Sequence, residues 1–424
     1  MDSPGLYEEG FAYVAASVQY NGLYGYPDAA MGVGLTVWDS ARYGDLHITD
    51  DALSFDIFTQ IARAVGKDRL LGAAATSASG ASGASNSTNP TTPIDPMGGL
   101  KVEKVFGVGE SQSGSRILSY ANGVQPIEGV FDALVPVVCA ARATDFAREL
   151  SHYKEDGKTQ GRTISAKIRE DIACKVFIIN SQTEANTLGS LAQPDTANIV
   201  SWQVAGASHL APKRMETVLL QTQRDGIIGY DIGEGELLKP VDWTNVYEAA
   251  LVRIQEWIDD GTQPPAMPPL SSINMLLGYF LDQHGNVKGG VRLPELTATI
   301  ATYDISLFAG LNGKVTAFTQ KEILALYPTH QDYVAKVAEE AHNAAAAGII
   351  LPYRADEYVK EAQLSWVASI WTDEPAVELL GGGSSFNVAL FVFVSACVLI
   401  VAALILLTLR VVRAIKNRRK SKAQ

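Results

Sequence analysis

Residues 102–121 have the sequence VEKVFGVGESQSGSRILSYA, in which an apolar segment runs directly into a helical pattern. Its first part, Val102 to Val108, is rich in β-branched and aromatic residues and predicts a buried strand. Its last part, Ser113 to Ala121, predicts a helix that follows the strand almost without a loop. A turn this abrupt forces the residue at its centre, Ser111, into a strained backbone conformation.

The residues around Ser111 have the pattern small-x-Ser-x-small, in which Gly109 and Ser113 are the small residues. Such a turn lifts the serine hydroxyl above the sheet and directs the backbone N–H of Gln112 toward the place of an oxyanion. The pattern therefore predicts that Ser111 is a nucleophile and that the Gln112 N–H is an oxyanion donor. A shifted alternative would make Ser113 the nucleophile, with the turn two residues inside the helix.

A serine nucleophile needs a base, and the base needs an orienting carboxylate. In a strand-to-helix arrangement of this kind they follow later strands in the order serine, acid, histidine. His209 is the predicted base, because it lies in a small-residue loop after an apolar strand at Ile199–Ala205. Glu184, after a strand at Lys175–Asn180, is the predicted acid, and Asp195 on the same connection is the alternative.

Apolar and helical patterns recur along the rest of the chain. They predict strands at Phe11–Ser17 and Val130–Val138, a hairpin at 279–293, and helices at 52–65, 163–172, 243–259, 319–326, 331–347 and 354–370. Strands that alternate with helices predict an α/β fold, with a mostly parallel sheet covered by helices on both faces.

The same patterns suggest how the chain is divided. We expect a catalytic core at 1–270, with a flexible loop at 74–99 that is rich in Ala, Ser, Gly and Thr. Residues 140–172 form a long connection that could close over the site as a lid. A hairpin and helical part at 271–370 completes the main domain, and a linker follows at 371–385.

Residues 386–409 are 24 consecutive residues without a charge. A bilayer core needs about 20 apolar residues in a helix, so this stretch predicts a single transmembrane helix. The following residues, 410–424, contain seven Lys and Arg and no Asp or Glu. The positive-inside tendency predicts a cytoplasmic tail and a main domain on the non-cytoplasmic side.

Composition excludes several classes of partner. The net charge is −12, and the basic tail makes the rest of the chain still more acidic. Nucleic-acid binding needs a basic surface on the folded domain, so we expect no nucleic-acid partner. Cys139 and Cys174 are predicted to be free thiols, and no cluster of Cys and His suggests a metal or cofactor.

Several segments resemble the uncharacterised "alpha/beta hydrolase domain" family of bacteria and fungi, up to about residue 366. Its site motifs are similar to GESQSG (109–114), SQTEA (181–185), QPD (193–195) and AGASH (205–209). Similar segments without a catalytic role are GFAYVAASVQ (10–19), ARYGDL (41–46), SFDIFTQIARAV (54–65), GGVRLPELTATIATY (289–303) and LYPTHQDYVAKV (326–337). The resemblance implies esterase-like hydrolysis with Ser111, His209 and Glu184 or Asp195.

The resemblance also places Phe11–Ser17 at the fourth strand of the hydrolase sheet. The sequence has no counterpart of the earlier strands, of an export signal, or of the loop that supplies a second oxyanion donor. These gaps together predict that the natural gene begins further upstream. We expect a small ester-like substrate and transfer of the acyl group to water, with transfer to an alcohol or amine as a variant. The alternative is a non-catalytic, membrane-anchored binding or adhesion module on the same fold.

Overall fold

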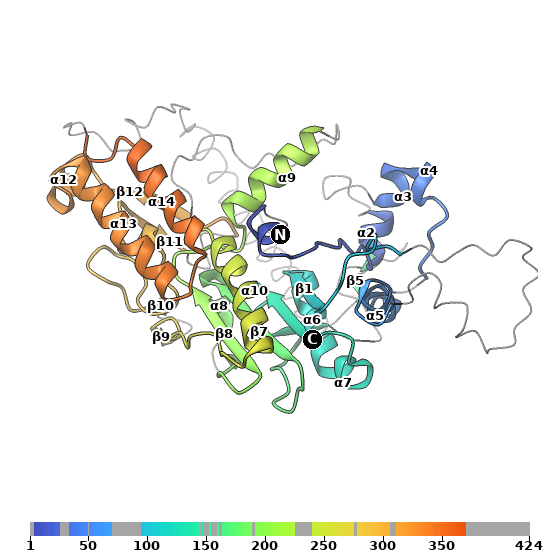
Figure 1. Cartoon of the computed structure of the whole chain (residues 1–424). Coiled ribbons are helices and arrows are strands. Elements are labelled where there is room, and N and C mark those ends of the chain that lie inside the picture. Colours follow the sequence, from blue (N-terminus) through green and yellow to red (C-terminus); the bar gives the residue numbers. More distant parts are fainter. Residues whose placement is uncertain are drawn as a thin grey trace, which may run out of the picture. The chain divides into compact units, whose positions relative to one another are not determined.

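The computed structural model describes residues 4–25, 34–49, 51–69, 95–144, 146, 152–153, 159–160, 163–188, 191–224, 240–274, 278–305 and 311–369. All of them belong to one compact unit, Met1–Leu380 (Figure 1). The predicted linker at 371–385, membrane helix at 386–409 and tail at 410–424 lie outside these residues, as does most of the predicted loop at 74–99. None of the helices within the described ranges has both the length and the apolar character needed to cross a bilayer.

Four parallel strands form the central sheet. In spatial order they are β1 (Phe106–Glu110), β2 (Ala133–Val137), β7 (Lys175–Ser181) and β8 (Ile199–Val204). The side chains of β2 are buried throughout, and those of β7 nearly so, which explains why these strands are continuous apolar runs in the sequence. The predicted mostly parallel sheet is therefore confirmed, with strand ends that shift by a few residues.

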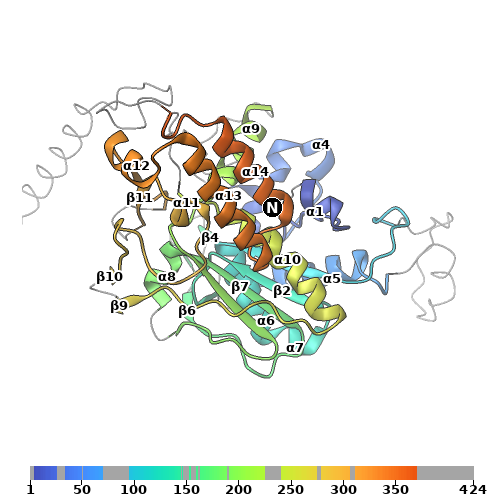
Figure 2. The same cartoon turned by 60° about the vertical axis from the view of Figure 1, so that its left-hand side comes forward.

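Helices cover both faces of this sheet. On one face, α5 (Leu53–Val65) and α6 (Gln112–Gly123) pack against Leu134, Val176 and Ile178. On the other face, α10 (Thr244–Asp259) packs against the alternate residues, among them Val135 and Phe177. Figure 2 shows α6 and α10 with the strands between them. A buried ion pair at 2.9 Å between Arg116 and Asp51 connects α6 to the chain just before α5.

The segment at Phe11–Ser17, predicted as a strand, belongs to no sheet in the structure. Its Phe11 ring contacts Phe106 of β1, with centroids 5.8 Å apart, but Tyr13 and Val14 are 53% and 42% exposed. An apolar run predicts burial and extension, whereas a strand also requires a hydrogen-bonded neighbour that the run cannot specify.

The connection at 140–172 also differs from its prediction. The helix expected at 163–172 is absent from the described chain there, and β6 (Thr163–Ser165) instead pairs antiparallel with β3 (Arg142–Thr144). A second short pair joins β4 (His152–Tyr153) to β5 (Thr159–Gln160). Thr144 hydrogen-bonds Ser119 near the C-terminal end of α6. The lid expected here stays a prediction, because parts of the connection lie outside the described residues.

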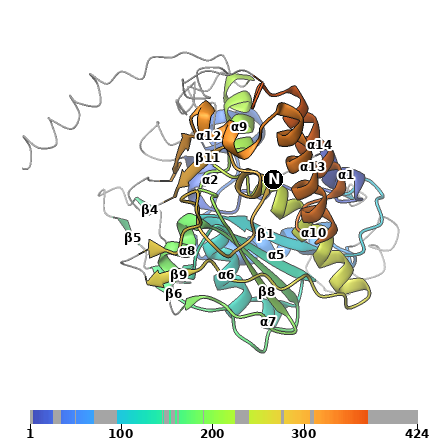
Figure 3. The ribbon, with the colours of Figure 1, turned by 90° about the vertical axis from the view of Figure 1, so that its left-hand side faces the viewer.

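The C-terminal part forms largely as predicted. The expected hairpin contains an antiparallel bridge between Leu281 and Val287, with the turn at Gly285. Three helices follow, α12 (Gln320–Leu326), α13 (His330–Ala346) and α14 (Pro352–Leu364), and α14 ends earlier than expected. Thr319 and Thr329 begin the first two with capping boxes. Figure 3 shows α13 and α14 side by side.

The remaining elements of the described chain are short or peripheral. The helices are α1 (Pro4–Glu8), α2 (Tyr20–Tyr24), α3 (Leu35–Trp38), α4 (Ser40–Tyr43), α7 (Gln125–Glu128), α8 (Gln182–Leu188), α9 (Pro212–Arg224) and α11 (Pro294–Thr297). The strands are β9 (Ser272–Asn274) with β10 (Gly278–Tyr279), and β11 (Ala301–Asp304) with β12 (Lys314–Ala317), both pairs antiparallel.

Candidate active site

Ser111 is the single residue between strand β1 and helix α6. Its backbone has φ 58° and ψ −117°, a conformation that costs a non-glycine residue about 1–3 kcal/mol. Two hydrogen bonds hold it there. The Ser111 N–H donates to the Val137 carbonyl at 2.8 Å, and the Ser115 N–H donates to the Ser111 carbonyl at 3.0 Å. The sharp, strained turn expected from the sequence is therefore present.

Two glycines make room for this turn. A Cβ at Gly109 would overlap the backbone of Ser113, and a Cβ at Gly114 would lie 2.7 Å from the Val137 carbonyl oxygen and 2.9 Å from the Cβ of Cys139. Ser113, in contrast, is exposed, and its hydroxyl donates to Gln19 at 3.3 Å. After Ser111, the position that must be small is therefore Gly114, three residues along, rather than the Ser113 of the sequence pattern.

His209 lies in the loop that follows strand β8, and its Nε2 is 3.0 Å from the Ser111 Oγ. Its backbone N–H donates to the Thr183 hydroxyl at 3.2 Å, which attaches the loop to the neighbouring connection after β7. Gly206 in the same loop has a positive φ of 70°, and a Cβ there would lie 2.8 Å from a methyl group of Val241. The structure thus brings together Ser111 and His209, which are far apart in the sequence.

Glu184 occupies the first turn of α8, directly after β7, and is 7% exposed. Its Oε1 is 2.7 Å from His209 Nδ1. Its other oxygen, Oε2, accepts hydrogen bonds from the Ser181 hydroxyl at 2.6 Å and the Ser181 N–H at 3.2 Å. A carboxylate only accepts, so Nδ1 carries the proton, and Nε2 is left to accept from the Ser111 hydroxyl.

The competing candidates lie elsewhere. Asp195 is exposed, and its carboxylate accepts the Ser201 N–H at 2.9 Å at the start of β8 rather than contacting His209. Ser113 lies within the first turn of α6, with its hydroxyl on Gln19. Of the two predicted acids, the structure places Glu184 beside the histidine.

Two opposing effects act on the pKa of His209. Burial lowers the pKa, while the hydrogen bond that His209 donates to Glu184 and the negative charges of Glu184 and Glu110 raise it. The net result is a pKa above the usual value, so the imidazolium is stabilised at this position. A base in this setting holds a proton more readily than a free histidine.

Glu110 and Arg214 form an ion pair beside this cluster, with Arg214 Nε 2.6 Å from Glu110 Oε2. Glu110 is the last residue of β1, and Arg214 lies in the first turn of α9. The sequence pattern alone does not connect Glu110 to Arg214. The charged residue directly before the serine, Glu110, is visible in the sequence. Arg214 could not be inferred as its partner, because helix α9 brings it to Glu110 only in the folded protein.

Gln112 is the first residue of α6, so its backbone N–H is one of the first-turn amides that have no carbonyl acceptor within the helix. The positive end of the helix dipole is at the same place. An anionic oxygen beside Ser111 would therefore find a donor and a favourable field. The thiols of Cys139 and Cys174 are free, and burial raises the pKa of each to about 12, which leaves them unreactive.

The alpha/beta hydrolase domain family matches residues 1–360 of the chain. No curated protein and no solved structure matches it. The family match covers the parallel sheet, the turn at Ser111 and the loops that carry Glu184 and His209. The chain belongs to the alpha/beta hydrolase domain family.

Proposed function

We propose that the protein is a serine hydrolase that cleaves carboxylic esters through Ser111, His209 and Glu184. The observation that carries this proposal is the continuous line of contacts from the Ser111 hydroxyl to His209 at 3.0 Å and on to Glu184 at 2.7 Å. The family supplies the hydrolase fold but no substrate. A reactive serine is the simplest chemical use of these three groups in this order.

In the proposed reaction, His209 Nε2 takes the proton of Ser111 as its Oγ forms a bond to the ester carbonyl carbon. The negative charge that develops on the carbonyl oxygen is stabilised by the Gln112 N–H. The bond to the alkoxide then breaks, and His209 gives its proton to the leaving oxygen. Water repeats the sequence, releases the carboxylic acid and restores Ser111.

Glu184 has a positioning and electrostatic role in this scheme. Its Oε2 is held by Ser181, so the carboxylate has little freedom to turn away from His209. The raised pKa of His209 is the expected consequence of that contact, and it favours the protonated imidazole that forms during attack.

The first experiment is labelling of the purified protein with a small fluorophosphonate, beside its Ser111→Ala and Ser113→Ala variants. We expect labelling of the wild-type protein and of Ser113→Ala, and complete loss in Ser111→Ala. Retained labelling in Ser111→Ala would remove Ser111 from its role. A folded protein that is never labelled would favour a binding module over an enzyme.

We further propose that residues 386–409 anchor the protein in a membrane, with the main domain on the non-cytoplasmic side. The support is the uncharged 24-residue stretch and the seven cations that follow it. Carbonate extraction of membranes tests the anchor, and protease protection of the tail tests the orientation. Release of the full-length chain by carbonate would contradict the proposal.

A further inference from the structure

Helix α14 runs toward the side of the sheet that carries the candidate active site. Two contacts with α10 give its direction. Near the start of α14, Arg354 pairs with Glu248 at 2.6 Å, and one turn later the hydroxyl of Tyr358 accepts from Asn245 at 3.1 Å. The two helices are therefore antiparallel. Because the N–H of Val241, just before α10, donates to a carbonyl of the active-site loop after β8, α14 ends on the active-site side.

Three exposed apolar side chains lie at this end of the main domain. Leu364, the last residue of α14, is 72% exposed, and Trp366, two residues later, is 59% exposed. Leu326, the last residue of α12, is 37% exposed. We refer to these three residues as the apolar end.

The chain around Trp366 is held against the rest of the domain. The side chain of the next residue, Val367, is buried in a cluster with Ile323 and Tyr327, at the end of α12. The carbonyl of Val367 accepts a hydrogen bond from His330 Nδ1 at 2.8 Å. These contacts bring the ends of α12 and α14 together. The exposure of Trp366 is therefore a property of the folded domain and not of a frayed helix end.

The place where the chain leaves the domain indicates what covers the apolar end. The described residues end at 369, and the uncharged stretch predicted to span a membrane begins at 386. The connection between them cannot reach further than about 60 Å, even when it is fully extended. A bilayer that contains residues 386–409 is thus always within reach of the apolar end. Tryptophan rings favour the boundary between headgroups and hydrocarbon, and leucine side chains add apolar area there.

We infer that Leu326, Leu364 and Trp366 rest on the surface of a lipid bilayer, with the side of the sheet that carries Ser111 turned toward the lipid. This inference rests on the proposed membrane anchor, which keeps the domain beside the bilayer. The anchor makes the contact intramolecular, so a modest gain from three apolar side chains is enough to select one orientation. Ester substrates would then reach Ser111 from the bilayer and not from bulk water.

Photo-crosslinking in phosphatidylcholine vesicles tests the contact. The full-length chain carries benzoylphenylalanine in place of Leu364 or, as the matched control, in place of Ile127. Ile127 is 80% exposed and lies on α7, which Figures 1 and 3 show at the opposite end of the strands from α14. We expect about tenfold more phospholipid adduct at position 364 than at position 127. Equal yields, or adducts at 364 only with residues 370–385 or with a second copy of the chain, would overturn the inference.

A double variant tests the orientation. Leu364→Ser combined with Trp366→Ser should slow labelling of Ser111 by a fluorophosphonate attached to a vesicle lipid by about fivefold. Labelling by a small water-soluble fluorophosphonate should stay within about twofold, which also shows that the variant is folded at its active site. Ile127→Ser should change neither rate. An unchanged rate with the lipid-borne probe would show that the apolar end does not orient the domain.

These outcomes separate the inference from the proposed function. If carbonate releases the full-length chain from membranes, the anchor fails and this inference fails with it. If the chain is retained but position 364 gives no lipid adduct, only this inference is wrong. If neither fluorophosphonate labels Ser111, the hydrolase proposal fails, and crosslinking still decides whether the apolar end contacts lipid.

Discussion

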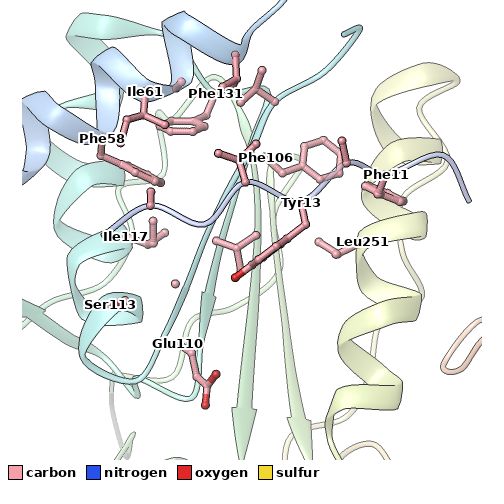
Figure 4. Close-up of a pocket in the computed structure, with 18 of the residues that line it drawn as sticks. Phe11, Tyr13, Phe58, Ile61, Phe106, Glu110, Ser113, Ile117, Phe131 and Leu251 are labelled. Carbon is pink, nitrogen blue, oxygen red and sulfur yellow. The ribbon is translucent and has the colours of Figure 1, made fainter. Parts of the chain in front are cut away.

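The two edges of the central sheet are completed in different ways. At the β8 edge, the backbone of Val291 accepts a hydrogen bond from the Ala205 N–H at 2.9 Å and donates one to the Gln203 carbonyl at 2.8 Å. The Val291 side chain is fully buried. At the β1 edge, the chain at 11–18 forms no strand, and a cavity of about 860 Å³ is lined by both this segment and β1 (Figure 4).

Substitutions at the two edges should therefore have different effects on the free energy of unfolding. The β8 edge is closed by backbone hydrogen bonds and a continuous apolar core, so changes there should act on the free energy of unfolding. The β1 edge borders a cavity and has no paired strand among the described residues, so changes there should cost less unfolding free energy. The candidate active site spans both, since Ser111 follows β1 and His209 follows β8.

The largest expected effect comes from changing Glu184, which holds His209 beside Ser111. Glu184→Gln keeps the shape of the side chain but cannot hold the His209 tautomer and charge in the same way. We expect kcat to fall by about 10⁴-fold with little change in thermal stability. Ester hydrolysis and thermal melting measure the two. A fall of less than tenfold would mean that Glu184 does not orient His209.

Glu295 lies at the start of α11, directly after the chain that closes the β8 edge, and Tyr358 donates to both its oxygens. Burial raises the pKa of Glu295 to about 7, although the Tyr358 hydrogen bond and Lys213 oppose this shift. The unfolded chain releases this proton at lower pH, so stability is lost as the pH rises from about 4.5 to about 7.

Glu295→Gln should therefore match the wild-type protein at pH 5 and exceed it at pH 8, by at most about 3 kcal/mol. Urea unfolding at both pH values measures the difference. Glu361→Gln, at an exposed position of α14, is the matched control and should show no pH-dependent gain. An equal effect of Glu295→Gln at both pH values would show that the carboxyl does not titrate in this range.

Removing the same atoms at each edge compares the edges directly. Val291→Ala empties a fully buried position at the β8 edge and should cost about 2–3 kcal/mol of unfolding free energy. Val108→Ala removes a half-buried side chain on the cavity wall and should cost about 1 kcal/mol. Denaturant midpoints measure both. Equal costs would mean that the cavity wall is packed as tightly as the closed edge.

The smallest expected effect is a shift in a pH profile. Glu110 helps to raise the pKa of His209, which must be neutral to accept the serine proton. Activity therefore increases as the pH rises through this raised pKa. Glu110→Gln should move this rise to lower pH, while Glu339→Gln on the distant helix α13 should not. An unchanged profile for Glu110→Gln would assign Glu110 only to the ion pair with Arg214.

The sequence predicted the parts of the fold that depend on local pattern. The strands before Glu184 and His209 are buried almost throughout, so each is an apolar run that can be recognised without a partner, whereas β1 before Ser111 was recognised by the turn that follows it. The order serine, acid, histidine then selected three residues that the structure brings within hydrogen-bonding distance.

What could not be predicted depends on contacts between distant parts of the chain. Residues 11–17 have the composition of a strand but lie in no sheet of the described structure, because pairing is decided by the neighbour. Gly114 must be small only because the end of β2 passes beside it. Glu110 finds Arg214 through the placement of α9, which no spacing in the sequence encodes.

The close contact of Gly114 with the end of β2 also bears on the order in which parts of the molecule fold. β1, α6 and β2 follow one another along the chain and pack together, so the strained turn at Ser111 is held by contacts between near neighbours in sequence. Structure built from local contacts forms faster than structure that needs long chain closures. We expect the turn to form early during folding. Its histidine partner follows β8, the last strand of the sheet along the chain, and therefore depends on contacts between residues much further apart in the sequence.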